Sequence, residues 1–280
     1  DTYNLPPVNN GDTTYLIDGP VFETIHDTGG VDTIDLSAFD FDIQFNLSFY
    51  GFSYDEDSNQ WIFTIKHNEI GTELLSYEGG EETSGYILNL SPFSIIENLI
   101  LGSGNDTVEL FHPGGEVKNL IETGGGNDLV YGVSWYDSIF TEAGNDDIRA
   151  VSINFSLIDG GLGYDKLSIS QELLENGLYS IDLRELANGQ IQGIEELDYS
   201  VEMVNGEGQI LLSSQTFKSL GKNVLTIKAT WQSDYTQAIG LEGNFKLAGS
   251  SGTYDIYTLS ENGEIYTLFV WKDHYVFKVD

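Results

Sequence analysis

The sequence predicts an all-β fold, a right-handed parallel β-roll or β-helix solenoid with a β-hairpin insertion and a small antiparallel β cap at its C-terminal end. Three observations predict it. A glycine-rich turn that ends in aspartate recurs in the middle of the chain, each copy leads into a short apolar or β-branched run, and the copies follow at nearly constant spacing. A unit this short cannot bury its own apolar face, so consecutive units are expected to stack as coils.

Four copies of the turn define the repeat. They read "LGSGNDTVEL" (101–110), "TGGGNDLVY" (123–131), "TEAGNDDIR" (141–149) and "GGLGYDKLS" (160–168), and their aspartates are 22, 18 and 19 residues apart. Each interval holds a second apolar run, "KNLIE", "DSIFTE" or "INFSLI", so one coil should contain two short strands and two turns. Stacked coils would place each aspartate about 4.8 Å from the last, the distance between paired strands.

Alternation along the strands selects the side chains that should face the core. On this basis the inward residues are predicted to be Val108, Leu110, Leu129, Tyr131, Ile148, Leu167 and Ile169.

The flanking segments extend this organisation. "NNGDTTYLI" and "DTGGVDTIDLS" are expected to form two earlier coils in the same phase, and residues 48–88 one or two inserted hairpins. After the repeats we expect short helices in "SQELLENG" and "SSQTFKSLG", and from about residue 223 an antiparallel cap that closes the stack. The chain is thus divided into a roll over residues 1–170, and a continuation with the cap over residues 171–280.

The charge balance restricts the partners. The 280 residues include 45 acidic and 11 basic side chains, for a net charge of −34, so nucleic acid and anionic membrane surfaces would be repelled. No apolar run reaches about 18 residues, so no membrane-spanning helix is expected. The acidity is explained equally well by solubility in a salty medium or by carboxylates that bind cations.

The turn chemistry favours calcium as the cofactor. Glycines at alternate positions allow carbonyl oxygens to face a common point, and the aspartate adds a carboxylate. Calcium takes six to eight such oxygens, whereas magnesium requires stricter octahedral geometry. Without a cation, two carboxylates about 5 Å apart would repel by about 3 kcal/mol at an effective dielectric constant near 20. Solvated turns without metal remain the alternative.

Three calcium sites are predicted between successive aspartates, and a fourth between the two early turns. The predicted metal-site residues are Gly102, Gly104, Asp106, Gly124, Gly126, Asp128, Glu142, Gly144, Asp146, Gly161, Gly163 and Asp165, together with Asp12, Gly30 and Asp32.

Residues 101–168 resemble the nonapeptide repeats of the repeat-in-toxin (RTX) family, G-G-x-G-x-D-x-U-x, with Val108, Val130, Ile148 and Leu167 at the apolar U position. "TIHDTGGVDTIDLSAF" and "SIIENLILGSGNDTV" are similar to segments that lead into the repeats of serralysin-type proteases. "GIEELDYS", "ILLSSQTF" and "LTI" resemble the closing cassette of large RTX adhesins.

The resemblance implies a calcium-binding β-roll in a protein that bacteria export by type I secretion and that folds outside the cell. Three turns depart from the family pattern, because Leu101, Thr123 and Glu142 replace glycines. The half-coils between the turns lack the motif, so calcium is expected along one edge only.

No catalytic motif is found. HExxH, GxSxG and the phosphate-binding GxxxxGK[ST] are absent, and His67 with Glu69 has the wrong spacing for a zinc site. We therefore expect a non-enzymatic, secreted or cell-surface module with a structural or adhesive role. Three alternatives remain: the noncatalytic C-terminal region of a secreted protease or polysaccharide-degrading enzyme, a glycosidase that uses a carboxylate pair in a groove along the roll, and a carbohydrate-binding module in which Trp61 and Trp231 contact sugars. An extracellular glycan or another surface protein would then be the partner.

Overall fold

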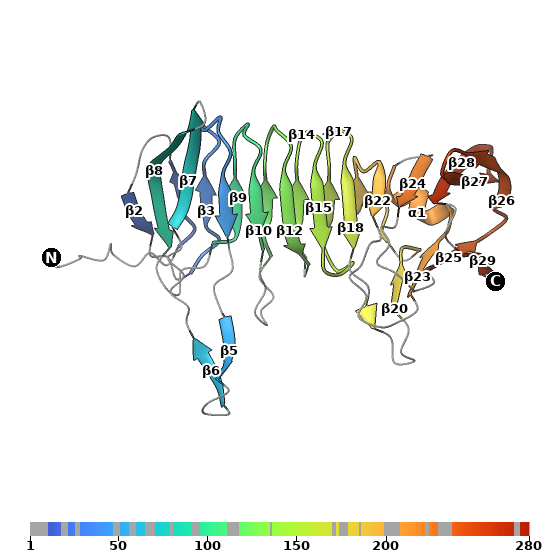
Figure 1. Ribbon diagram of the computed structural model, residues 1–280, viewed down its shortest axis with the longest axis horizontal. Helices are drawn as coiled ribbons and strands as arrows, with labels where there is room; N and C mark the ends of the chain where they lie inside the picture. The colour runs from blue at the N-terminus through green and yellow to red at the C-terminus, as the bar shows by residue number, and fades with distance from the viewer. Residues whose placement is uncertain are drawn as a thin grey trace.

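The computed structural model describes residues 11–17, 22–25, 29–46, 51–55, 60–64, 71–78, 81–90, 96–110, 118–134, 136–169, 172–173, 179–184, 186–198, 208–221, 224–228, 237–271 and 275–279. Over these residues the chain is wound into an elongated stack of short strands, with the first third of the sequence at one end and the last third at the other (Figure 1). The pairings between successive coils are parallel, which confirms the predicted all-β, parallel solenoid-like fold.

One side of the stack is a seven-stranded parallel sheet. In spatial order its strands are β1 (Thr14–Leu16), β3 (Thr33–Asp35), β9 (Asn98–Ile100), β11 (Leu120–Glu122), β13 (Ser138–Phe140), β16 (Leu157–Asp159) and β21 (Ile191–Gln192). The runs "KNLIE", "DSIFTE" and "INFSLI" supply β11, β13 and β16, so the prediction of a second strand in each coil is confirmed.

The other side is a ten-stranded sheet. In spatial order its strands are β4 (Gln44–Asn46), β10 (Thr107–Glu109), β12 (Leu129–Val133), β15 (Asp147–Ala150), β18 (Lys166–Ile169), β22 (Glu196–Asp198), β24 (Val224–Lys228), β28 (Glu264–Trp271), β27 (Tyr254–Glu261) and β26 (Lys246–Ser251). The repeats thus contribute one strand per coil to each sheet, and the core lies between the sheets.

Stacked aliphatic side chains form this core. Val108 pairs in register with Val130, which pairs with Ile148, which pairs with Leu167, and all four side chains have no exposed surface. Burial of each of these side chains stabilises the folded state by about 1.5–3 kcal/mol. Leu110 and Ile169 are also buried, as predicted.

The inward assignment of β12 was wrong. Leu129 and Tyr131 are only partly buried and lie in register with Thr107 and Glu109, whereas Val130 faces the core. Because side chains alternate along a strand, an error of one position exchanges the two faces of the whole strand.

The insertion consists of two antiparallel hairpins, as predicted. One joins β5 (Gly51–Asp55) to β6 (Gln60–Thr64) and projects from the stack, and the other joins β7 (Gly71–Glu78) to β8 (Glu81–Leu90) (Figure 1). Strand β8 also pairs in parallel with β2 (Phe22–Ile25), so the second hairpin is attached to the N-terminal part of the chain.

The stack continues beyond the repeats. A third sheet consists of β19 (Glu172–Leu173), β20 (Tyr179–Asp182), β23 (Gly208–Leu212), β25 (Gln237–Glu242) and β29 (Tyr275–Val279). Strand β18 pairs with β22 across residue 170, so the proposed boundary between roll and continuation lies within one sheet. The predicted antiparallel cap comprises β26, β27 and β28, while β28 and β29 still pair in parallel with the preceding coil.

Of the two expected helices one is confirmed. Helix α1 (Ser214–Ser219) begins with a capping box in which Ser213 and Thr216 exchange hydrogen bonds. Its Ser219 hydroxyl donates to the Leu186 carbonyl and its Ser219 carbonyl accepts from the Gly189 amide, so the helix is bonded to the segment that precedes β21. The helix expected in "SQELLENG" is wrong where the structure describes this segment, because Glu172 and Leu173 form β19, which pairs with β20.

Candidate metal centre

The glycine-rich turns lie along one edge of the stack. They cover residues 101–106, 123–128, 141–146 and 160–165, each connecting a strand of the seven-stranded sheet to one of the ten-stranded sheet. We call them the glycine turns. Within the last two, β14 (Ala143–Gly144) and β17 (Leu162–Gly163) pair in parallel along the upper edge in Figure 1. The structure therefore brings the four turns into one row, as the spacing predicted.

Close backbone contact explains the glycines. A Cβ on Gly126 would lie 1.8 Å from the Gly104 carbonyl oxygen, and the Gly126 φ angle of 123° is unfavourable for other residues. Glu142 occupies the place of Gly124 and Gly161 in its turn and adopts the same left-handed backbone, with φ of 59°. The Glu142 side chain is exposed, so this predicted site residue has no carboxylate in the interior.

Several turn carbonyls hydrogen-bond to the neighbouring coil. The Gly102 oxygen accepts from the Gly125 amide at 2.9 Å, and the Glu142 oxygen accepts from the Leu162 amide at 2.6 Å. These oxygens hold the turns together, a role that the sequence interpretation, which assigned the turn carbonyls to a metal, did not include.

The four aspartates of the glycine turns form a continuous stack, here called the aspartate ladder (Asp106, Asp128, Asp146 and Asp165). One carboxylate oxygen of each accepts the backbone N–H of the corresponding residue in the preceding coil. These N···O distances are 2.7 Å from Ile43 to Asp106, 2.8 Å from Asp106 to Asp128, 2.8 Å from Asp128 to Asp146 and 3.0 Å from Asp146 to Asp165. The bonds fix one oxygen of each carboxylate and determine the spacing of the ladder.

A second ladder runs beside the first with the opposite direction. The side-chain oxygen of Asn105 accepts from the Asn127 amide at 2.8 Å, that of Asn127 from the Asn145 amide at 2.8 Å, and that of Asn145 from the Tyr164 amide at 2.9 Å. At its start the Asp42 carboxylate accepts from the Asn105 amide. These side chains are exposed, so the asparagine ladder satisfies the backbone on the outer side of the turns.

The aspartate ladder is buried and incompletely satisfied. Its four residues are at most 2% exposed, and the second carboxylate oxygen (Oδ2) of Asp106, Asp146 and Asp165 accepts no hydrogen bond. Burial raises the pKa of Asp106 and Asp165 from 3.8 to about 7 and that of Asp128 to about 6, and the adjacent negative charges add to the effect. Buried oxygens of this kind are costly unless a proton or a cation neutralises them.

Asp128 differs because a side chain in its own turn satisfies it. The Thr123 hydroxyl donates a short hydrogen bond to Asp128 Oδ2, and Thr123 stands where the repeat pattern has its first glycine. That hydrogen bond opposes the effect of burial on the pKa of Asp128. Thr141 stands at the same place in the turn of Asp146, but its hydroxyl donates to the Gly160 carbonyl at 3.1 Å, while the other two turns have Leu101 and Gly160 there.

Replacing Thr123 by valine is expected to lower the free energy of unfolding in calcium-free buffer at neutral pH by about 1–3 kcal/mol, because it leaves a buried carboxylate oxygen without a donor. Urea denaturation in the presence of a chelator measures the change. Thr107→Val on the partly exposed β10 serves as the control and should change stability by less than about 0.5 kcal/mol. Equal losses in the two variants would contradict this role of the hydroxyl.

The donor set of the ladder fits a hard divalent cation. Carboxylate and carbonyl oxygens are the ligands that calcium prefers, and Asp106, Asp146 and Asp165 each offer a buried oxygen without a hydrogen-bond partner. Among the described residues no three acidic or histidine side chains converge on one point, so a cation there would also need backbone or water oxygens. Bound calcium would supply positive charge between the coils.

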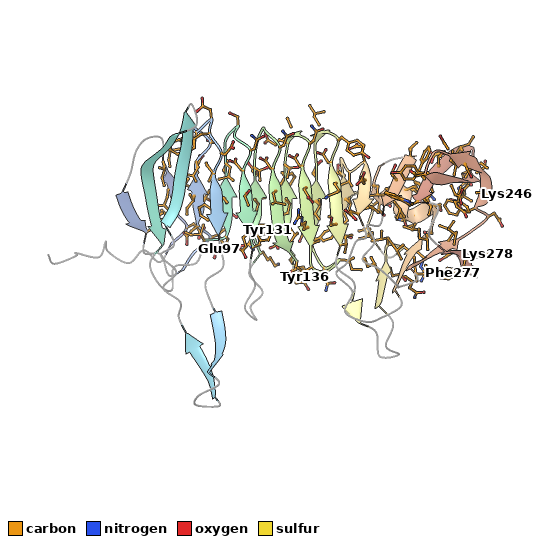
Figure 2. All side chains as sticks on the ribbon, in the orientation of Figure 1. Glu97, Tyr131, Tyr136, Lys246, Phe277 and Lys278 are labelled. Atoms are coloured by element: carbon orange, nitrogen blue, oxygen red, sulfur yellow. The ribbon has the colours of Figure 1, made fainter. Side chains whose placement is uncertain are left out.

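The predicted fourth site, with Asp12, Gly30 and Asp32, was placed on the wrong edge. Asp32 precedes β3 of the seven-stranded sheet, and its amide donates to Glu97, which precedes β9. Figure 2 places Glu97 and Tyr136 along the lower edge of the stack, opposite β14 and β17 in Figure 1. The early turn therefore does not continue the aspartate ladder.

Asp12 is also one position out of register with Asp32. Thr13 lies opposite Asp32 and donates its amide to that carboxylate at 2.9 Å, while Asp12 lies opposite Val31 and is exposed. Gly30 presses against the backbone of Gly11, so its role is close contact between the first two coils.

Sequence reasoning missed Glu195, which lies opposite Asp165 in the next coil and accepts its amide at 2.9 Å. The signal was present in "GQIQGIEEL", where a glycine precedes Glu195 by two residues, as in the repeats. Trp231, His67 and the other three histidines lie outside the described residues, and for Trp61 only the backbone in β6 is described.

The chain matches no protein-family model, and no curated protein matches it in sequence. In the part of the chain that the structure describes, no helix has the length and apolar character needed to cross a membrane.

Proposed function

We propose that this chain is an extracellular calcium-binding module of the RTX type, folded and stiffened by calcium, with a structural or adhesive role in a secreted or cell-surface protein. The observation that carries the proposal is the aspartate ladder. Four buried carboxylates follow one another in adjacent coils, three of them with an oxygen that accepts no hydrogen bond. A stack of this kind is unfavourable when ionised and favourable when divalent cations neutralise it.

Calcium binding would act on folding because the ladder exists only in the folded chain. The ladder residues come from four coils, and each one contacts the backbone of the coil before it. A ligand that binds the folded state alone stabilises it by about 2.7 kcal/mol per site at a concentration of 100 times Kd. Calcium would therefore also join neighbouring coils, which is the basis of the proposed stiffening.

An extracellular location agrees with the net charge of the chain. The net charge of −34 favours cations over anionic partners, and calcium modules outside cells have Kd values of about 10⁻⁴–10⁻³ M. Because residues 101–168 resemble RTX repeats, we also propose that bacteria export the protein by a type I system. Calcium-dependent folding would then keep the chain unfolded until it reaches the calcium outside the cell.

Far-UV circular dichroism and thermal unfolding in chelator and in excess calcium test the proposal. We expect the folded spectrum and a clearly higher Tm in calcium, and a lower Tm or an unfolded spectrum in chelator. Magnesium at the same concentration is the control, because it requires near-ideal octahedral geometry and loses its water ligands reluctantly, so it should give a smaller shift. A spectrum and Tm that do not differ between chelator and calcium would contradict calcium binding.

A further inference from the structure

The ten-stranded sheet continues the register of the aspartate ladder beyond the last glycine turn. Asp147 pairs with Lys166 between β15 and β18, and Lys166 pairs with Glu196 between β18 and β22. The residue that precedes each of these strands therefore lies in one row. Glu195 occupies this row directly after Asp165, although it is outside the four repeats.

The turn that carries Glu195 (193–195) is shorter than the glycine turns, but it also contains a glycine. Gly193 precedes Glu195 by two residues in the sequence, but it lies opposite Gly160 of the preceding turn, and its φ of 66° resembles that of Gly161 (76°) and not that of Gly163 (150°). A Cβ on Gly193 would lie 2.4 Å from the Gly161 amide nitrogen, so only glycine allows this coil to approach the preceding turn so closely. The approach brings the Glu195 side chain to the end of the aspartate ladder.

Two hydrogen bonds join Asp165 to Glu195, and a third joins Asp165 to Glu196. Glu195 Oε2 accepts the Asp165 amide at 2.9 Å, which matches the bonds between successive aspartates of the ladder. In return the Asp165 carbonyl oxygen accepts from the amides of Glu195 and Glu196 at 3.0 and 3.1 Å. The relative position of the two acidic residues is thus fixed by the backbone.

One oxygen of the buried Asp165 carboxylate has no hydrogen-bond donor. Its side chain has no exposed surface, its Oδ2 accepts no hydrogen bond, and Glu195 adds a second negative charge beside it. We propose that a divalent cation, tested here as calcium, binds between Asp165 and Glu195 as an additional site one coil beyond the repeats. This inference rests on the proposed function, since it extends calcium binding to a glutamate that the repeat pattern does not include.

Calcium stoichiometry of the full chain tests the site. Isothermal titration or equilibrium dialysis with calcium chloride compares the native protein with Glu195→Gln, which keeps the length and the acceptor for the Asp165 amide but removes the charge. We expect the variant to bind one calcium ion fewer per chain, with the remaining affinities within twofold. Glu109→Gln, which removes the same charge from β10 on the outer face of the same sheet, should bind as many ions as the native protein.

Two outcomes separate this inference from the proposed function. If the native protein binds calcium and Glu195→Gln binds the same number of ions with the same affinities, the additional site is overturned and the proposed function stands. If the native protein binds no calcium, both are overturned. Should Glu195→Gln fail to fold, Glu195→Asp provides the test. Its shorter side chain should weaken one site at least tenfold, and affinities all within twofold of the native values would overturn the site.

Discussion

In calcium-free buffer the protein is expected to lose stability as the pH rises from about 4 to about 8. Burial raises the pKa of Asp106 and Asp165 to about 7 and that of Asp128 to about 6, compared with 3.8 in the unfolded chain. Between these values the folded state binds more protons than the unfolded state, so the free energy of unfolding falls as pH rises. The contribution of these groups is complete below pH 3.8 and is lost as the pH passes through about 7.

Carboxylates in ion pairs have the opposite dependence. Hydrogen bonds from Arg184 lower the pKa of Asp182, so the stability that this pair contributes is present at neutral pH and is lost as the pH falls below 3.8. The calcium-free protein should therefore be most stable near pH 4 and should lose stability steadily up to about pH 7.

Saturating calcium is expected to reverse the slope over this range. A cation competes with protons for the same carboxylates, so its binding strengthens as they ionise. Thermal or urea unfolding at pH 4–8, in chelator and in calcium, measures both slopes. Stability that increases with pH in chelator would contradict the assignment of raised pKa values to the ladder.

Two double variants that remove the same charge test whether the ladder causes the pH dependence of stability in calcium-free buffer. Asp106→Asn with Asp165→Asn removes two of the raised pKa values and should flatten the dependence between pH 5 and 8. Asp40→Asn with Glu142→Gln removes the same charge from exposed positions and should leave the slope as in the native protein. Flattening in both variants would mean that the net charge of −34, and not the buried ladder, causes the slope.

Replacing Gly126 by alanine is expected to destabilise the protein by about 3 kcal/mol or more, or to prevent folding. The new Cβ would lie 1.8 Å from the Gly104 carbonyl oxygen, and the backbone at φ of 123° is itself unfavourable for alanine. Relief of the clash would require neighbouring coils to separate, which would break the 2.8 Å bond between the Asp106 amide and Asp128. Urea denaturation in calcium measures the loss.

Gly125→Ala is the matched control in the same turn. A Cβ on Gly125 would have its nearest contact 3.8 Å away at the Ala143 oxygen, and its φ is not in the left-handed region. We expect a change within about 0.5 kcal/mol. Similar losses at the two neighbouring glycines would show that the fit between coils is looser than the structure indicates.

The repeat made much of the fold and site predictable. Because Asp106, Asp128, Asp146 and Asp165 recur with the same local pattern, equivalent residues had to occupy equivalent places in successive coils, and the structure stacks them in register. The apolar U positions, such as Val130 and Leu167, were predictable for the same reason. The hydrogen bonds of the ladder, and the one that Thr123 donates to Asp128, are visible only in the three-dimensional structure.

Other features depend on pairing between distant segments. Ile43 and Asp106 are neighbours in the stack, and the insertion separates them by 63 residues, so spacing could not show that β4 begins the ten-stranded sheet. Glu195 follows Asp165 in the same way after 30 residues, with a glutamate in place of the repeated aspartate.

The sequence by itself determined that the chain stacks short coils, that four aspartates share one edge and that aliphatic residues fill the interior, because a local pattern that repeats must give a local structure that repeats. Only the tertiary structure decided the edge on which Asp32 lies, the inward side of β12 and the residue that ends the aspartate ladder. Those depend on strand register, and the hydrogen bonds that set register are made with the neighbouring coils and not within the segment itself.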